Sequence, residues 1–168
     1  LRLIDSSDVK LSNHNIVSGM DSFLFQTNDN ITFEKKKFQV VSKIKPTNKI
    51  MDELIFSFNV CRSVKSNAIV ITQNSRTLGI GSGQPSRLDS CRIAIEKMKK
   101  FNQFNKIHPV VAASDAFFPF IDGIEKLVQA GVSAVIQPSG SIRDKEIIKF
   151  ANKTNTILVF SKTRHFKH

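Results

Sequence analysis

Residues 110–144, VVAASDAFFPFIDGIEKLVQAGVSAVIQPSGSIRD, decide the fold. This stretch reads as a strand, a loop, a helix, a second strand, a second loop and the start of another helix. The strands are expected at 110–113 and 133–136, and Gly131 is expected to end the helix between them. Strands that alternate with helices in this way are typical of an α/β sheet with parallel strands.

The loops of this stretch are where a ligand is expected. Parallel α/β sheets bind their ligands at loops outside the carboxyl ends of strands. The first loop holds Phe117, Phe118 and Phe120, and three exposed phenylalanines would be costly unless a ligand or partner covers them. The second loop, residues 138–141, has the corresponding place after the second strand.

The helix starts of the chain are marked by capping signals. Residues 46–48, Pro-Thr-Asn, predict the start of a first helix. Three further starts have the spacing of a capping box, in which two side chains three residues apart satisfy backbone N–H groups. These pairs are Ser86 with Asp89, Asp122 with Glu125, and Ser141 with Asp144.

The rest of the chain supplies the other strands and helices. Residues 1–45 are expected to be strands and loops that lead into the main α/β part, residues 46–168. Apolar residues at helical spacing from Met51 to Cys61 predict a helix that faces the core. The remaining expected elements are strands at 22–26, 38–44, 68–72, 77–81 and 156–160, a helix after Ser86, and a polar connector at 99–108.

Length and composition fit one domain with a hydrophobic core. The chain has 168 residues, is 40% hydrophobic, and has no apolar run near the ~20 residues of a membrane helix. Its start has no signal-peptide pattern, and because the first residue is Leu we expect a piece of a longer protein. Cys61 and Cys91 form neither a disulfide framework nor a zinc-binding pair, which favours a cytoplasmic setting and two core thiols.

The net charge of +11 favours anionic partners such as nucleic acid, phosphorylated metabolites or acidic lipid. The chain is also rich in Lys, Asn, Ile and Phe and has no Trp, which fits codon drift in an AT-rich genome. Lysines are spread over most segments, and the only tight runs are 35–37 and 97–100. We therefore favour codon drift over a nucleic-acid patch as the origin of the charge.

Residues 79–84, GIGSGQ, do not form a dinucleotide-binding motif, because GxGxxG requires a sixth-position glycine where Gln84 stands. We expect these glycines to let the backbone approach a ligand closely, beside a helix start that can hold an anionic or carbonyl group. Four polar residues near the loops have structural alternatives that spacing alone does not remove. They are Asn67 as a turn residue, Arg87 as a solvated cation, Asp122 as a helix cap, and Arg164 as a charge on a frayed tail.

Composition and spacing thus lead to an α/β domain whose loops suit an anionic, planar ligand. Five motifs in order extend this interpretation, because together they resemble the bifunctional purine-biosynthesis enzymes that join an AICAR transformylase to an IMP cyclohydrolase. The resemblance covers nearly the whole chain and is weak over roughly the first forty residues. The motifs are KSNAIV (65–70), TLGIGSGQPSR (77–87), SDAFFPFIDGI (114–124), AVIQPSGSIRD (134–144) and RHFKH (164–168).

The resemblance implies transfer of a formyl group from 10-formyltetrahydrofolate to the 5-amino group of AICAR, the phosphoribosyl-aminoimidazole-carboxamide that precedes IMP. It implies a cytidine-deaminase-like, three-layer α/β/α fold with a mixed sheet, of which this chain would be the second and C-terminal subdomain. It also implies a homodimer with shared active sites. No metal is implied, and the deaminase zinc signature, HxE with PCxxC, is absent from the sequence.

The resemblance also implies roles for seven residues at matching motif positions. These side chains would act mainly by binding and positioning, because aromatic rings can stack on planar ligands and arginine can pair with phosphate. The implied substrate-binding residues are Asn67 and Arg87 around the base and carboxamide, Phe117 beside the nucleotide and Arg164 near its phosphate, and the implied folate-binding residues are Pro119, Phe120 and Asp122.

Parts of the family pattern have no match in this sequence. The family's Lys-His pair, which carries proton transfer, belongs to the first transformylase subdomain, and nothing here matches it. The cyclohydrolase domain is missing too, so we expect the chain alone to be inactive. Pro85 is a smaller departure, since many relatives have another residue there.

A non-catalytic alternative stays open: a basic remnant that binds RNA or nucleotide through its positive charge. The lysines are not interleaved with aromatic residues, as stacking platforms for nucleic acid require. RNA binding would fall steeply with salt and would be indifferent to Phe117→Ala. Binding of AICAR or folate would instead be lost on Arg87→Ala.

Overall fold

The structure is a computed structural model that describes residues 14–29, 37–101 and 108–167. The chain divides into two compact units, Leu1–Thr32 and Phe33–His168. In the first unit, β1 (His14–Gly19) and β2 (Ser22–Thr27) pair as an antiparallel hairpin around a turn at Met20 and Asp21. The strand predicted at 22–26 is therefore confirmed as β2.

The second unit is built on a six-stranded sheet with the order β3-β8-β7-β6-β4-β5. The neighbours β6, β7 and β8 run parallel, whereas β4 is antiparallel to both β5 and β6, and β3 is antiparallel to β8. The sheet is therefore mixed, as expected. Its strands are β3 (Gln39–Val40), β4 (Ile69–Gln73), β5 (Arg76–Gly81), β6 (Val110–Ser114), β7 (Val132–Pro138) and β8 (Ile157–Ser161).

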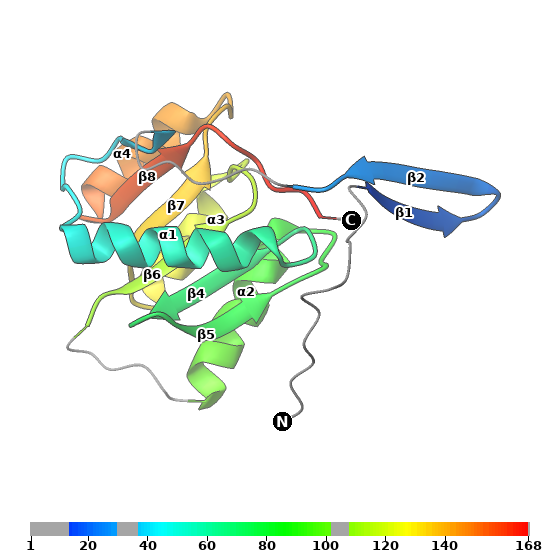
Figure 1. Ribbon diagram of the computed structural model, residues 1–168. Coiled ribbons are helices and arrows are strands. Elements are labelled where there is room, and N and C mark those ends of the chain that lie inside the picture. Colours follow the sequence, from blue (N-terminus) through cyan, green and yellow to red (C-terminus); the bar gives the residue numbers. More distant parts are fainter. Residues whose placement is uncertain (1–13, 30–36, 102–107, 168) are drawn as a thin grey trace. The chain divides into compact units, whose positions relative to one another are not determined.

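Helices cover both faces of this sheet (Figure 1). The first, α1 (Asn48–Arg62), packs on one face, and the other three pack on the opposite face. The expected three-layer α/β/α arrangement is therefore confirmed. None of the described helices is long and apolar enough to cross a membrane. The other three helices are α2 (Arg87–Phe101), α3 (Ile121–Gln129) and α4 (Asp144–Lys153).

Each central strand contributes side chains to two hydrophobic cores, because successive side chains of a strand point to opposite faces. In β4, Ile69 and Ile71 join the core under α2, α3 and α4, while Val70 joins the core under α1. In β8, Leu158 and Val159 divide in the same way. Burial on both faces explains why these strands are continuous apolar runs rather than alternating ones.

Several predicted boundaries are wrong. The strand expected at 38–44 is paired only over Gln39–Val40, and the connector expected at 99–108 begins as helix, since α2 continues to Phe101. Residues 102–107 lie outside the described part of the chain. The first helix does begin as predicted, because the hydroxyl of Thr47 accepts a hydrogen bond from the N–H of Ile50.

None of the three predicted capping boxes forms. At α2 the carboxylate of Asp89 accepts from the side chain of Arg92 instead. The N-cap of α3 is Phe120, and Asp122 accepts instead from the N–H of its neighbour Gly123. At α4 the helix begins only at Asp144, whose carboxylate accepts from the N–H of Gly140. Short polar side chains near a helix start have several local N–H groups within reach, so spacing alone does not select one.

Two of the three glycines in the 79–84 segment, Gly79 and Gly81, serve packing rather than a ligand, which corrects the sequence-based expectation for these two residues. A Cβ added at Gly79 would lie 2.0 Å from the carbonyl oxygen of Ala94, and one at Gly81 would lie 1.9 Å from that of Ser90. Both carbonyls belong to α2, so the missing side chains let α2 lie directly on β5. This close contact places the start of α2, and with it Arg87.

We expect Gly79→Ala to lower the free energy of unfolding by about 3 kcal/mol, because backbone must move to admit the methyl group. Chemical denaturation measures the change. Gly19→Ala is the matched control, since nothing lies within 4 Å of a Cβ at Gly19. Equal stability of the two variants would contradict the close packing of α2 on β5.

Candidate functional site

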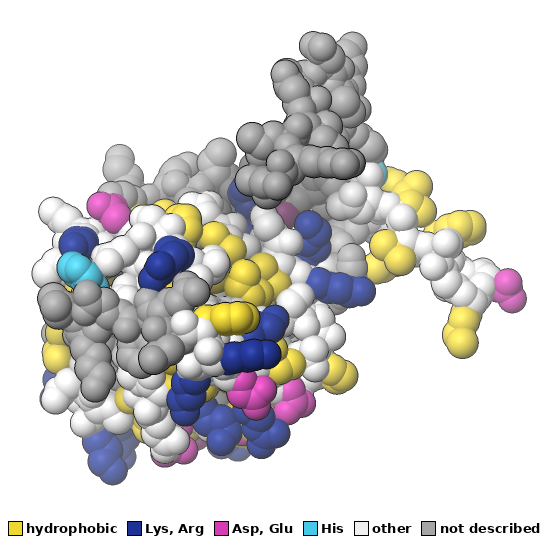
Figure 2. Space-filling model, turned by 90° about the horizontal axis from the view of Figure 1, so that it is seen from below, with side chains coloured by type: hydrophobic (Ala, Val, Ile, Leu, Met, Phe, Trp, Pro, Cys, Tyr) yellow, Lys and Arg dark blue, Asp and Glu magenta, His cyan; other side chains and the backbone are white. Residues whose placement is uncertain are grey.

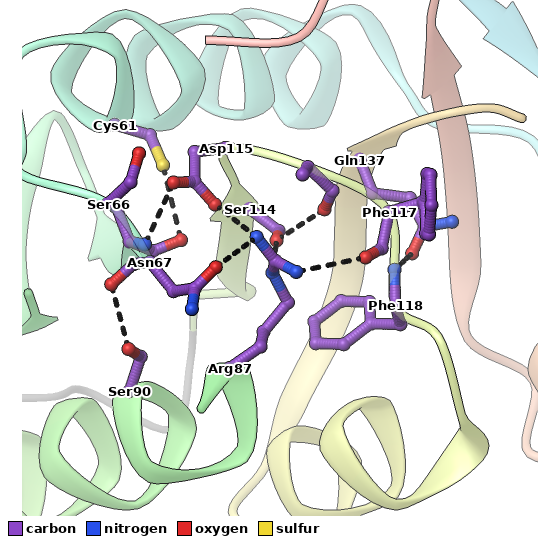
Figure 3. Close-up of polar contacts among 12 residues, drawn as sticks. Cys61, Ser66, Asn67, Arg87, Ser90, Ser114, Asp115, Phe117, Phe118 and Gln137 are labelled. Carbon is purple, nitrogen blue, oxygen red and sulfur yellow. Dashed lines mark hydrogen bonds and ion pairs between the residues drawn. The ribbon is translucent and has the colours of Figure 1, made fainter. Parts of the chain in front are cut away.

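The candidate site lies at the carboxyl ends of β6 and β7, as expected for a sheet with parallel strands. Because β4 runs antiparallel to β6, its first residue, Ile69, pairs with Ser114 at the end of β6. This register brings Asn67 and Ala68 beside Asp115. The first residue of α2, Arg87, reaches into the same place, so three distant segments meet there (Figure 3).

Arg87 is the centre of the hydrogen-bond network. Its Nη2 donates to Oδ1 of Asp115 at 2.7 Å and to Oδ1 of Asn67 at 2.9 Å. Its Nε donates to the hydroxyl of Ser114 at 3.0 Å, and its Nη1 donates to the carbonyl of Phe117 at 3.2 Å. We call these five residues the Arg87 network. The solvated arginine that spacing had left open is therefore excluded.

The network leaves Arg87 with little spare hydrogen-bonding capacity. A guanidinium has five N–H donors, and the contacts above use four. Among the described residues, the second N–H of Nη1 has no protein partner. The side chain is only 11% exposed, so the Arg87 network presents a single donor to a ligand.

Asp115 fixes the Arg87 network in the protein interior. This residue was not identified from the sequence as part of the site. Its side chain is completely buried, and its Oδ2 accepts from the N–H of Ala68 at 3.0 Å. Its backbone carbonyl accepts from the N–H of His165 at 3.0 Å, which ties down the C-terminal segment. A carboxylate placed directly after an apolar strand, at the start of a ligand loop, was the signal that could have found it.

The side chain of Asn67 also forms its hydrogen bonds within the protein. Its Nδ2 donates to the carbonyls of Gln84 at 2.9 Å and Pro85 at 3.1 Å, while its Oδ1 accepts from Arg87. The backbone carbonyl of Asn67 accepts from the hydroxyl of Ser90. Asn67 thus orients Arg87 and the loop before α2.

A pocket of about 390 Å³ opens beside the network, and we call it the Arg87 pocket. Five of the seven predicted site residues line it, which brings the proposed nucleotide and folate sides together. Phe118 forms a wall and is buried, because Gly123 leaves room for its ring: a Cβ at Gly123 would lie 2.7 Å from Phe118. The predicted lining residues are Asn67, Arg87, Pro119, Phe120 and Asp122.

The other two predicted residues form a separate contact. The guanidinium carbon of Arg164 lies 5.6 Å from the ring centroid of Phe117, within the range of a cation–π interaction. The tail is not frayed there: His165 bonds to Asp115, and Ser66 exchanges two hydrogen bonds with Lys167, of 2.9 and 3.1 Å. Figure 3 shows Phe117 at the Arg87 network, so this loop links both arginines.

The aromatic loop is less exposed than its sequence suggested. Phe118 is 1% exposed and belongs to the core, and Phe117 is half-buried. Only Phe120 is largely exposed, at 53%, and the guanidinium of Arg143 lies 4.9 Å from its ring centroid. Among the described residues, no three His, Cys, Asp or Glu side chains gather in a way that could hold a metal ion.

Comparisons with known proteins agree with the sequence motifs. The family described as the AICARFT/IMPCHase bienzyme matches residues 1–97. Bifunctional purine biosynthesis protein PurH of Aquifex aeolicus (strain VF5) is 47% identical over 152 residues, which are 90% of this chain and 29% of the relative. The protein of the same name from Buchnera aphidicola subsp. Schizaphis graminum is 47% identical over 148 residues, 88% of this chain and 28% of the relative.

The chain thus spans less than a third of the length of these curated relatives. Among solved structures, the chain is similar to the apo form of dCMP deaminase from the cyanophage S-TIM5. That similarity has a TM-score of 0.44 and 16% sequence identity, and covers 67% of this chain and 98% of the deaminase chain.

Both cysteines are buried, and the thiol of Cys61 lies behind the Arg87 network, where it donates to the carbonyls of Ala68 and Ala113. Burial raises the pKa of the Cys91 thiol to about 12. Burial, and then the charge of Asp115, raise the pKa of Cys61 well above its usual range, against a smaller opposite effect of Arg87. Both side chains therefore stay protonated, and neither suits nucleophilic chemistry.

We expect neither thiol to react with Ellman's reagent at pH 8 in the folded chain. As the pH rises from about 9 towards 12, thiols ionise in the unfolded chain but not in the folded one, so the free energy of unfolding should fall. The Cys61→Ala/Cys91→Ala variant is the control and should lose this part of the decline. Rapid labelling of the folded chain would contradict the expected burial.

Proposed function

The chain belongs to the AICARFT/IMPCHase bienzyme family, and from this premise we propose that it supplies part of an AICAR transformylase active site. The reaction is formyl transfer from 10-formyltetrahydrofolate to the 5-amino group of AICAR. The whole protein would also act as IMP cyclohydrolase. The observation that carries the proposal is the Arg87 network, because it joins three family motifs beside one pocket.

In this proposal the residues bind and orient the two substrates. The remaining N–H of Arg87 would donate to the carboxamide oxygen of AICAR, which sets the direction of the neighbouring amine. The ring of Phe117 would pack against the planar imidazole, and the exposed Arg164 would pair with the phosphate. Pro119, Phe120 and Asp122 would hold the folate, with the carboxylate accepting from N–H donors of the pterin.

The chemistry itself needs groups that this chain does not carry. The amine nitrogen attacks the formyl carbon, the new C–N bond forms as the bond to N10 of the folate breaks, and the proton moves from the amine to N10. The resemblance assigns this proton transfer to a Lys-His pair with no match here. We therefore expect the chain to bind substrate weakly and to be inactive alone, with the whole enzyme a cytoplasmic homodimer that needs no metal.

A second candidate is binding of a polyanion such as RNA, favoured by one surface feature. A depression of about 430 Å³ is lined by Lys43, Lys145, Lys149 and Lys153, and among the described residues none of these lysines forms an ion pair. The face in Figure 2 gives no such support, since its Lys and Arg side chains lie beside Asp, Glu and hydrophobic ones.

A salt titration separates the two candidates. If four lysines neutralise RNA phosphates, log K should fall against log salt with a slope of about −3, from −0.7 for each of four contacts. We expect instead that AICAR binding exceeds RNA binding at 150 mM salt, roughly physiological, and is lost on Arg87→Ala. Two results together would favour the polyanion function. RNA binding would fall steeply with salt and be abolished by Lys145→Gln/Lys149→Gln, and AICAR would not bind.

We also expect Arg164→Gln to weaken AICAR binding about 10- to 100-fold, since it removes a charge-assisted bond to phosphate. Binding of the riboside, which lacks the phosphate, should stay within about twofold. Isothermal titration calorimetry with both ligands measures this difference, and the exposed neighbour Lys162→Gln is the matched control. Equal losses for nucleotide and riboside would contradict a phosphate role for Arg164.

A further inference from the structure

We propose that Asp115 determines the class of ligand group that Arg87 accepts: a neutral carbonyl oxygen, and not an anion. The inference rests on the proposed function only where it takes the carboxamide of AICAR as that carbonyl. The exclusion of phosphate and other anions from a buried arginine by a buried carboxylate is a property of this chain alone.

The charge of Asp115 disfavours an anion at Arg87. Oδ1 of Asp115 lies 2.7 Å from Nη2 of Arg87, and the two side chains are 0% and 11% exposed. With so little water between them, the carboxylate cancels most of the positive field of the guanidinium. An anion at the remaining N–H would also be repelled by Asp115, whereas a neutral carbonyl oxygen meets no such repulsion.

Arg87 also has too few remaining N–H donors to bind an anion well. Arginine binds phosphate and carboxylate best through two parallel N–H groups. Asp115 and Asn67 occupy both N–H groups of Nη2, and Phe117 takes one of Nη1. The single remaining donor suits one carbonyl oxygen and cannot form a two-pronged contact with an anion.

Asp115 cannot move aside to admit an anion. Its Oδ2 is held by the N–H of Ala68 at 3.0 Å, and its own N–H donates to the carbonyl of Ala68 at 3.3 Å. Its backbone carbonyl accepts from His165. Both the backbone and the carboxylate of Asp115 are therefore held in place, and its charge stays beside Arg87, which lines the pocket.

Arg164 differs from Arg87 in its exposure and in its available N–H donors, so the two arginines suit different ligand groups. It is exposed, it packs on the ring of Phe117, and among the described residues it forms no ion pair or hydrogen bond. All five of its N–H donors remain for an anion. The site thus has one arginine that is neutralised for a carbonyl and one that is available for phosphate.

The test is Asp115→Asn, which keeps the shape of the side chain and removes its charge. We expect inorganic phosphate to bind at Arg87 at least tenfold more tightly in this variant than in the wild-type chain. The Nε–H signals of Arg87 and Arg164 in 15N NMR spectra, assigned with Arg87→Gln and Arg164→Gln, report binding at each arginine. Asp89→Asn is the matched control: it removes the same charge in the first turn of α2, outside the network, and should give no gain at Arg87.

A folded Asp115→Asn chain without this gain would overturn the proposal, as would a gain that persists in Asp115→Asn/Arg87→Gln. If Asp115→Asn does not fold, phosphate titration of the wild-type chain tests the proposal. Phosphate should shift the signal of Arg164 and leave that of Arg87 in place, and an equal response at Arg87 would refute the exclusion of anions.

The riboside of AICAR, which is neutral, gives a separate result. It should shift the Arg87 signal in the wild-type chain. If it binds nowhere while phosphate still discriminates between the two arginines, the transformylase proposal fails and the role of Asp115 stands. If the riboside binds at Arg87 and phosphate competes with it there, the role of Asp115 fails and the transformylase proposal stands.

Discussion

The structure of the site depends on one buried ion pair, between Arg87 and Asp115. Removing two charges from water is costly, and their attraction compensates only when the remaining polar atoms are satisfied. Here both carboxylate oxygens accept hydrogen bonds, and four of the five guanidinium N–H groups donate. Loss of either partner would leave an uncompensated charge, so the segments that carry them are held in one arrangement.

The mixed topology is what makes this pair possible. A purely parallel sheet would place the start of β4 at the opposite edge from the end of β6. Since β4 runs antiparallel to β6, the KSN motif before β4 and the aromatic loop after β6 lie at the same edge. The contact of α2 with β5 at Gly79 and Gly81 then brings Arg87 to this edge. Close backbone packing on one side of the sheet thus positions a charged group at its end.

The same pair organises the aromatic loop and the tail. Arg87 holds the carbonyl of Phe117, while Asp115 holds the N–H of His165 through its backbone. The ring of His165 packs against Phe58 of α1, with centroids 4.8 Å apart, so the tail is anchored in the core. The result is a rigid setting for the half-buried Phe117 and for the exposed Arg164 that packs on its ring. Preorganised groups of this kind lower the ordering cost of binding a ligand.

The sequence by itself determined the fold class, most of the elements and the family, because apolar runs and helical spacing record burial directly and five ordered motifs are specific in combination. Two predictions from the sequence about local contacts were wrong. The capping boxes predicted at Asp122 and Ser141 do not form, since a short polar side chain can bond to several nearby N–H groups. The ligand contact predicted for Gly79 and Gly81 is wrong, because their spacing equally suits a helix packed on a strand. The sequence shows a carboxylate, Asp115, directly after an apolar strand, but only the tertiary structure revealed what it binds, because its partners Arg87 and Ala68 are 28 and 47 residues away along the chain.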